Sequence, residues 1–454
     1  MTATTLAQEI QDAAIDFGDL ESEYRPMLKL VEQLIGVVPN CDPYLEIWPT
    51  GFRSYNLLVP NLLNLPASLV GAGAPKELVG LAMYVSSRAA ECMYCSAHTC
   101  SFALRRGASP DALVGQYSGE EAAVVRVAEG ISRFPAYLPR SDITDLRKYR
   151  SDAEIEWLVL SVAMMGFLNK FMDTMGIELE QSAIDDVADL ISATGWKVGK
   201  HGWSDEDLDE FTDQLEGRPL QIPNPDPQVN GATNGNGNGA SPGYAQVPTD
   251  GLGTYLKVMR QAPAALRLER GWTKGMASRT GNVVVTLEDE LGFAPSALAH
   301  LTHNRAIRAI GTVIRDNLNP ETTALGLGPK CLVALVYGRM AGNDVLVAEA
   351  VQMTERLAPE ISHNKLAAVS RFATSDMTTT TVPAGLTTAE AAAVMLAKAA
   401  APSPSEINQI TIANASSALG PAQLVELVTW LSIQQLLHRI QVFYDADGRF
   451  DEDD

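Results

Sequence analysis

The stretch KELVGLAMYVSSRAAECMYCSAHTCSFALRRG, residues 76–107, contains three of the five cysteines and one of the six histidines of the chain. Its apolar residues recur at helical spacing, and Gly107 follows two arginines, which is typical of a helix end. Cys92 and Cys95 form a C-x-x-C pair, and His98 follows three residues later. On a helix these three side chains share one side, because each lies one turn from the next.

A dithiol beside an imidazole has the groups that redox turnover needs. Unpaired amides at a helix start favour a thiolate, which can attack a peroxide or a disulfide, and a second thiol then resolves the product as an intramolecular disulfide. His98 is one turn from Cys95 and nearly two from Cys92. We therefore expect its base or positive charge to act mainly on Cys95, and Cys95 to have the lower pKa of the pair.

Two other interpretations of the cysteines stay open. A zinc site would need the pair, the histidine and Cys100, but one continuous helix cannot wrap four ligands around a tetrahedron, and the chain has no second C-x-x-C. We therefore expect neither a bound metal nor another cofactor. Buried, inert thiols are common in alanine-rich helices, and this interpretation is favoured for Cys41 and Cys331, which lie outside the motif.

Composition and charge exclude several classes of protein. The chain has 454 residues, of which 46% are hydrophobic and 20% charged, as in a globular protein of two or three domains. Its net charge of −21 repels phosphate backbones and anionic lipid, so we expect no nucleic acid and no membrane partner. The acidic N-terminal residues do not form a signal peptide, and the longest apolar run, 158–168, is too short to cross a bilayer. We expect a cytoplasmic protein.

Residues 224–243 alternate Asn, Gly and Pro without an apolar face, which predicts a flexible linker, bounded here at 216–249. On both sides the chain is rich in Ala and Leu at helical spacing, with cap signals such as Ser118 and Glu121 at the joints. The best strand-like run, NVVVTL, stands alone. We therefore expect an all-α protein.

The two flanks of the linker resemble one another. The matching segments, in chain order, are 74–82 with 328–336, 120–130 with 389–399, and 153–171 with 422–440. Three matches in the same order predict a tandem repeat of one helical module, with copies at 22–215 and 250–448 that pack against each other.

The predicted second copy lacks the dithiol and is degenerate. Continued without gaps, the first match places Leu346, Glu349 and Gln352 opposite the two cysteines and the histidine, in that order. A glutamate opposite Cys95 indicates a position near solvent or a cavity, which favours a functional role for the cysteines of the first copy.

The segment 76–107 resembles the core of the alkylhydroperoxidase D and carboxymuconolactone decarboxylase superfamily, in which an ELV helix leads into C-x-Y-C and Ala-His-Thr and ends at a glycine. The resemblance implies an all-α module that assembles into homo-oligomers and has thiol-dependent peroxidase activity. It also implies that Cys95 is the peroxide-reactive thiolate, Cys92 the resolving thiol and His98 part of a proton relay.

Peroxidase members of this superfamily place a glutamate about three turns before the first cysteine, where this chain has Gly80. The candidate relay carboxylates are Glu77, one turn earlier, and Glu91, next to the motif. Many peroxidase members also place the histidine four residues after the second cysteine, whereas His98 is at three.

The expected function is that of an antioxidant oxidoreductase that reduces hydroperoxides, with a protein or small thiol as its reductant. The decarboxylase members work without a cysteine pair, so the C-x-x-C disfavours that reaction. The alternative is a non-catalytic scaffold, or a binding protein that uses the same fold and dithiol to sense redox state.

Overall fold

The computed structural model describes residues 5–185, 187–202, 249–250, 252–376 and 381–450, and this part of the chain contains helices and no strand. The all-α prediction is therefore confirmed. The predicted linker, 216–249, lies outside the described residues except for Thr249.

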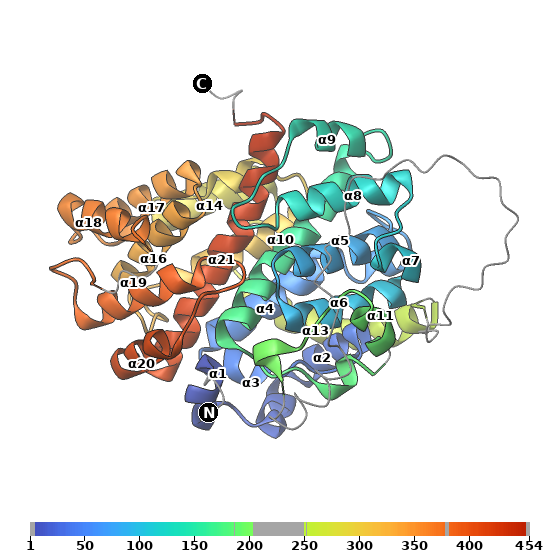
Figure 1. Ribbon diagram of the computed structural model, residues 1–454, viewed down its shortest axis with the longest axis horizontal. Helices are drawn as coiled ribbons and strands as arrows, with labels where there is room; N and C mark the ends of the chain where they lie inside the picture. Colours follow the sequence, from blue (N-terminus) through green and yellow to red (C-terminus); the bar gives the residue numbers. More distant parts are fainter. Residues whose placement is uncertain (1–4, 186, 203–248, 251, 377–380, 451–454) are drawn as a thin grey trace, which may run out of the picture.

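The first half of the chain supplies the helices on the right and at the centre of Figure 1. They are α1 (Leu6–Glu9), α2 (Phe17–Ile35), α3 (Asp42–Leu45), α4 (Pro49–Leu62), α5 (Lys76–Ala89), α6 (Met93–Arg106), α7 (Pro110–Leu113), α8 (Gly119–Gly130), α9 (Arg140–Leu146), α10 (Asp152–Met175) and α11 (Ala188–Ser192). Short 3₁₀ helices are η1 (Gln11–Ala13), η2 (Ala67–Val70), η3 (Gln181–Ala183) and η4 (Gly199–His201).

The second half supplies nine further α-helices among the described residues, most of them on the left of Figure 1. They are α13 (Leu252–Trp272), α14 (Thr280–Leu291), α15 (Asn304–Asn317), α16 (Leu327–Met340), α17 (Asp344–Leu357), α18 (His363–Ala373), α19 (Thr388–Ala400), α20 (Gln409–Ala418) and α21 (Pro421–Ala446), with the 3₁₀ helix η5 (Ser296–His300).

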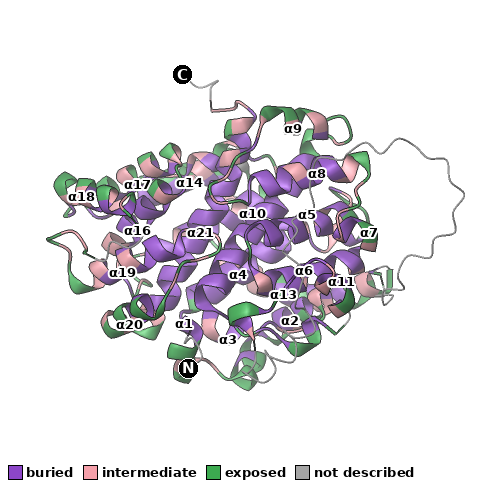
Figure 2. Ribbon diagram, in the orientation of Figure 1, coloured by how far each residue is buried: buried purple, intermediate pink, exposed green. Residues whose placement is uncertain are grey.

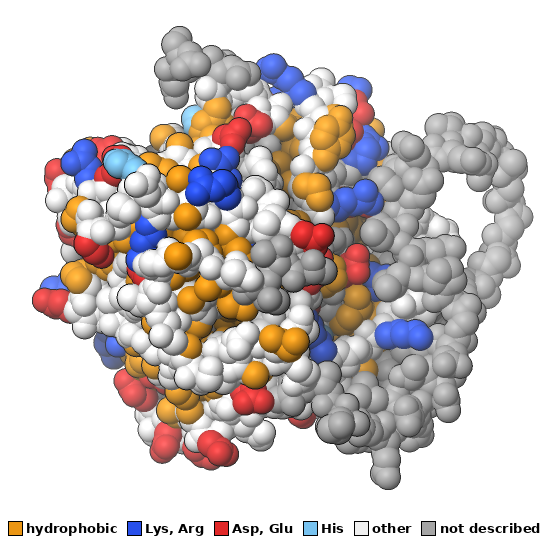
Figure 3. Space-filling model, turned by 60° about the vertical axis from the view of Figure 1, so that its left-hand side comes forward, with side chains coloured by type: hydrophobic (Ala, Val, Ile, Leu, Met, Phe, Trp, Pro, Cys, Tyr) orange, Lys and Arg blue, Asp and Glu red, His pale blue; other side chains and the backbone are white. Residues whose placement is uncertain are grey.

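The two halves share one core. The helices α10 and α21 lie side by side at the centre and are buried along most of their length (Figure 2), while α4 packs on α15 and α2 on α13. Within the described chain, α10 is the one helix long and apolar enough to match a membrane span by length and composition, and 94% of its most apolar window is buried inside the protein. On the face shown in Figure 3, acidic, basic and apolar side chains are mixed, with no broad basic field.

Local sequence signals account for several helix ends. Ser118 and Glu121 form the predicted capping box of α8, and Thr387 and Glu390 form the same box at the start of α19. Gly107 ends α6 at a φ of 98°, a left-handed conformation that glycine adopts without strain. The strand-like run NVVVTL lies inside α14, because the buried residues of that segment recur at helical spacing.

The order of helices in the two halves agrees with the predicted duplication, which stays a prediction. Helices α5 and α16 have 14 residues each, as do α6 and α17, and α8 and α19 carry the capping box described above. The central helices α10 and α21 have 24 and 26 residues.

If the halves are copies, the turns of the structure set a register that differs by three residues from the ungapped alignment at the cysteines. Glu91 and Gly342 both have a positive φ, 51° and 62°, in the turn before α6 and α17. Each is followed by the N-cap residue of the helix, Cys92 in the first half and Asn343 in the second. Cys92 therefore corresponds to Asn343, not to Leu346, because the two helices begin at these caps.

Shifting the register by three residues pairs Cys95 with Leu346 and His98 with Glu349. The charged residue of the second half thus stands in the place of the histidine rather than of a cysteine. Glu349 is buried and accepts hydrogen bonds from the backbone and side chain of Ser296, both at 2.7 Å. It is a partnered, buried carboxylate that lines a small cavity, so of the two alternatives expected for this position the cavity is present and solvent exposure is not.

The buried side chain of Lys170 connects the two halves of the chain by hydrogen bonds. It lies on α10 with 2% of its surface exposed. Its ammonium group donates to the carbonyl oxygens of Ala400 (2.6 Å), Ala401 (2.9 Å) and Pro402 (2.6 Å), where α19 ends. These carbonyls would otherwise lack donors, because the last carbonyls of a helix have no partner within it.

We expect Lys170→Met to lower the free energy of unfolding by about 3 kcal/mol, because three buried carbonyls lose their shared donor at once; burial lowers the pKa of Lys170 to about 7, so the loss rests on the hydrogen bonds and not on a full charge. Urea denaturation at neutral pH measures the change. The matched control is Lys197→Met at an exposed position, for which we expect a change below about 0.5 kcal/mol. Equal effects of the two substitutions would show that the buried contacts of Lys170 contribute nothing.

Candidate active site

The cysteine pair lies at the start of α6. Cys92 is the N-cap residue, and its Sγ accepts a hydrogen bond from the backbone N–H of Cys95 at 3.3 Å. Both side chains are buried, with exposures of 0% for Cys92 and 3% for Cys95. The turn before the helix places Cys92 where an amide of the first turn can stabilise negative charge on its sulfur.

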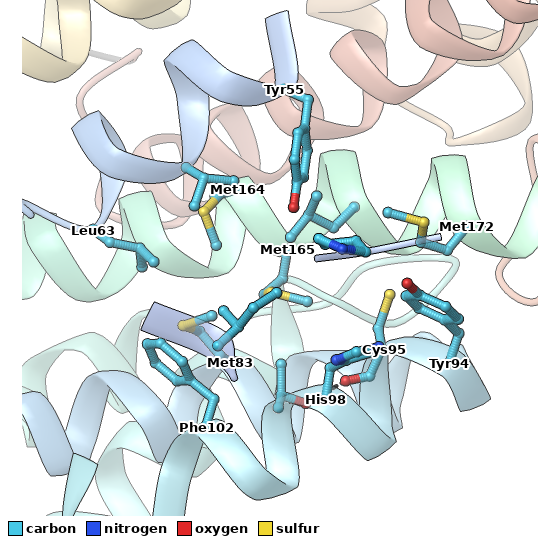
Figure 4. A pocket seen from close by; sticks show the side chains of 15 residues that line it. Tyr55, Leu63, Met83, Tyr94, Cys95, His98, Phe102, Met164, Met165 and Met172 are labelled. Carbon is cyan, nitrogen blue, oxygen red and sulfur yellow. Dashed lines mark hydrogen bonds between the residues drawn. The ribbon is translucent and has the colours of Figure 1, made fainter. Parts of the chain in front are cut away.

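An apolar cavity opens beside Cys95, with about 550 Å³ of space that no atom fills. Figure 4 shows Tyr94, Cys95, His98 and Phe102 of α6 on one side of it and three methionines of α10 opposite. Tyr55 of α4 directs its hydroxyl into it. Cys92 does not line this cavity, so Cys95 is the sulfur of the pair that a small molecule inside it would meet.

His98 is held by a carboxylate from a distant part of the sequence. Its Nε2 lies 2.7 Å from Oε2 of Glu180, in the segment after α10. The other oxygen of this carboxylate accepts hydrogen bonds from the hydroxyl of Tyr94 at 2.8 Å and from the backbone N–H of Asn40. Glu180 is 8% exposed, so a buried carboxylate with several donors fixes the imidazole at the wall of the cavity.

The electrostatics favour an ionised carboxylate at this position. Burial opposes the charge on Glu180, but the charge of His98 and its hydrogen bond, together with the N–H of Asn40, hold the pKa of Glu180 below its usual value. The carboxylate therefore stays ionised at neutral pH and accepts a hydrogen bond from the Nε2–H of His98. The imidazole is thus held at the cavity wall, where it can exchange a proton with a group formed there.

The relay carboxylate was predicted at Glu91 or Glu77, and the structure places neither beside His98. Both side chains are exposed, and the carboxylate bound to His98 is that of Glu180. Glu91 occupies the left-handed turn before α6, and Glu77 the exposed side of the first turn of α5. Spacing around the motif could not find Glu180, because 82 residues separate it from His98.

The pKa of Cys95 also differs from the expectation. Burial raises the pKa of the Cys95 thiol well above its usual value, and a hydrogen bond with Cys92 adds to the rise. The sequence predicts that His98 lowers the pKa of Cys95, but the imidazole ring of His98 is paired with Glu180. The backbone N–H of Cys95 donates to the sulfur of Cys92 at 3.3 Å, so this first-turn amide contacts Cys92 and not the thiol of Cys95.

The second half contributes one residue near the dithiol. Arg439 of α21 is fully buried, and its Nη1 donates to Ser86 Oγ at 2.6 Å and to the carbonyl of Val162 at 2.8 Å. Its Nε and Nη2 have no hydrogen-bond partner. Burial lowers the pKa of Arg439 to about 10, against the opposing effect of nearby groups that include Cys95 and Cys92. The guanidinium thus remains charged at neutral pH and favours a thiolate in the pair.

The remaining cysteines are buried free thiols. Cys41 lies outside the motif in the sequence. Burial raises the pKa of the Cys41 thiol well above its usual value, and the nearby charges of Asp42 and Glu180 add to the rise. Among the described residues, no group of three or more His, Cys, Asp or Glu side chains is arranged to hold a metal ion.

No family model matches the chain, and no curated protein matches it. Among solved structures, the chain is similar to the debrominase Bmp8 in its apo form, with 24% identity over 39% of this chain and 96% of the Bmp8 chain and a TM-score of 0.35. It is also similar to a cysteine-to-alanine variant of Bmp8 in complex with 2,3,4-tribromopyrrole, with 23% identity over 39% of this chain and 95% of that one and a TM-score of 0.35.

Proposed function

We propose that this protein is a thiol-dependent peroxidase of the alkylhydroperoxidase D type, which reduces organic hydroperoxides with the Cys92 and Cys95 dithiol. The observation that carries the proposal is the position of Cys95, whose side chain lines an apolar cavity next to the paired His98 and Glu180. A cavity lined by methionine and aromatic side chains suits an apolar molecule better than hydrogen peroxide.

The reaction starts with one proton shared by the sulfurs. Cys95 passes its proton to the Cys92 thiolate and attacks the distal oxygen of the hydroperoxide, so that the O–O bond breaks and Cys95 becomes a sulfenic acid. The departing alkoxide takes a proton from the imidazolium of His98 and leaves as an alcohol. The Cys92 thiol then attacks the Cys95 sulfur, water departs with the hydroxyl and the thiol proton, and a disulfide forms.

The proposal includes a reductant, a compartment and an assembly. Two electrons and two protons from a protein or small-molecule dithiol return the disulfide to two thiols, and a reducing compartment such as the cytoplasm supplies such partners. We also propose a homo-oligomer. Four apolar side chains of α13 are exposed and could lie in a subunit interface: Leu252, Leu256, Met259 and Leu266.

A redox-sensing or scaffold protein is the second candidate. The observation that favours it is the burial of Cys95, which leaves 3% of the side chain exposed and raises its thiol pKa. A thiol of this kind reacts slowly unless a molecule enters the cavity and proton transfer accompanies attack.

The test is to mix reduced protein with hydrogen peroxide or with cumene hydroperoxide, and to follow thiol loss together with turnover by a dithiol reductant. We expect sustained turnover, with kcat/KM at least about tenfold higher for the apolar hydroperoxide because it gains apolar contacts in the cavity. Thiols that resist oxidation in the folded protein and an absence of turnover would contradict the peroxidase and favour the scaffold.

A further inference from the structure

A second cavity meets the apolar one at His98. It has about 840 Å³ of space that no atom fills, and Ile35 and His98 line both cavities. Most side chains around it are polar: Ser101, Arg105, Ser182, Thr249, Asp250 and Thr254. The imidazole thus separates an apolar inner space that contains Cys95 from a polar outer space.

Arg105 gives the outer cavity a positive charge. His98, Ser101 and Arg105 follow one another along a single face of α6, because positions three, four and seven apart lie on the same side of a helix. No carboxylate of the described residues pairs with Arg105. The guanidinium packs against Gly36, whose φ is 94° and where an added Cβ would clash with Nη1, so the backbone holds it at the cavity wall.

Asp250, the acidic side chain in this lining, is already engaged. Its carboxylate lies 3.3 Å from Nη1 of Arg106, and its backbone carbonyl accepts a hydrogen bond from Lys76. The carboxylate of Asp250 is thus matched by one arginine, and the charge of Arg105 is left over. An unpaired guanidinium in a polar cavity is suited to bind a carboxylate through two parallel hydrogen bonds.

We propose that the two cavities together bind an amphipathic carboxylic acid. Its carboxylate lies on Arg105 in the outer cavity, and its apolar chain passes His98 and carries a hydroperoxide to Cys95. This inference rests on the proposed function for the hydroperoxide and on the two cavities for the acid. The rise of about 1.5 Å per residue puts Cys95 and Arg105 about 15 Å apart along α6, a span of roughly twelve bonds in an extended chain, since each bond advances the chain by about 1.25 Å.

Binding is tested without turnover by titrating decanoic acid and decan-1-ol into Cys95→Ser protein in a calorimeter. We expect the acid to bind at least about tenfold more tightly than the alcohol, and Arg105→Gln in the same background to remove that preference. Arg105→Lys keeps the positive charge but not the planar guanidinium group, so it should retain part of the preference for the acid. Arg371→Gln, at an exposed position on α18, is the matched control and should retain all of it.

Turnover is tested with the ω-hydroperoxide of decanoic acid and its methyl ester. We expect kcat/KM to favour the acid by at least about tenfold in the parent protein, and this ratio to fall toward one in Arg105→Gln. Equal binding of acid and alcohol, or an acid preference unchanged in both Arg105 variants, would overturn the inference. Arg105-dependent binding of the acid without turnover of either hydroperoxide would support the acid site and contradict the peroxidase.

Discussion

Replacement of Cys95 by serine abolishes hydroperoxide turnover in our account, with a loss of at least about 10³-fold in kcat/KM. The reason is that a hydroperoxide in the cavity meets Cys95, which lines it, and not Cys92, which does not. The Cys92→Ser variant should behave differently. It should consume one equivalent of hydroperoxide and then stop, because Cys95 can form a sulfenic acid but no disulfide.

A coupled assay with a dithiol reductant measures turnover, and a single-turnover experiment counts the equivalents consumed. The matched control is Cys331→Ser in the second half, where the thiol is buried far from the cavity lining and turnover should be retained. A Cys95→Ser protein that still turns over, or a Cys92→Ser protein that turns over normally, would contradict the division of roles.

The second large effect is expected at Glu180. Replacing it by glutamine removes the carboxylate charge that faces the imidazole of His98, and we expect kcat to fall by about 10²-fold because proton transfer from His98 to the departing alkoxide loses this support. Glu178→Gln is the matched control two residues away. Its side chain is exposed, so solvent screens the repulsion between its charge and that of Glu180, and its backbone carbonyl accepts a hydrogen bond from Asn40. The kcat of this variant should stay within about twofold of the parent.

The pH dependence of stability gives an independent readout of the same carboxylate. The folded pKa of Glu180 lies below its unfolded value of about 4.3, so its stabilising contribution is fully present above that pH and is lost as pH falls through the folded pKa. The difference in unfolding free energy between parent and Glu180→Gln should therefore narrow from pH 6 to about pH 3. Equal losses of kcat in Glu180→Gln and Glu178→Gln would show that Glu180 is not part of the relay. A difference in unfolding free energy that does not narrow at low pH would show the same.

Local signals in the sequence were sufficient for much of the fold. Capping boxes, the glycine after α6 and helical spacing of apolar residues act over a few residues, so the all-α class and the helix ends could be predicted from them. The sequence also predicts that Cys95 and His98 lie on the same side of their helix, because they are three residues apart.

The partners of these side chains could not be predicted, because they arise from tertiary packing. Glu180 reaches His98 from the segment after α10, and Arg439 reaches the dithiol region from the other half of the chain. Burial of Cys95 likewise reverses the pKa shift expected from the nearby histidine, since desolvation exceeds the effect of an imidazole that Glu180 already engages.

Under the predicted duplication, the sequence match and the turns of the structure set different registers between the two halves. The match of 74–82 with 328–336 sets an offset of 254 residues, whereas the left-handed turns at Glu91 and Gly342 set one of 251. Side-chain similarity within α5 and α16 outweighed the turn geometry in the alignment. The register set by the turns depends on their φ angles, which the sequence does not display.

Mass spectrometry after addition of one equivalent of an organic hydroperoxide tests the central claim most directly. Our account predicts a disulfide between Cys92 and Cys95 in the parent protein, and a sulfenic acid on Cys95 in the Cys92→Ser variant. A sulfenic acid on Cys92 in the Cys95→Ser variant would reverse the two roles. Reduced thiols at both positions in the parent would contradict the peroxidase itself.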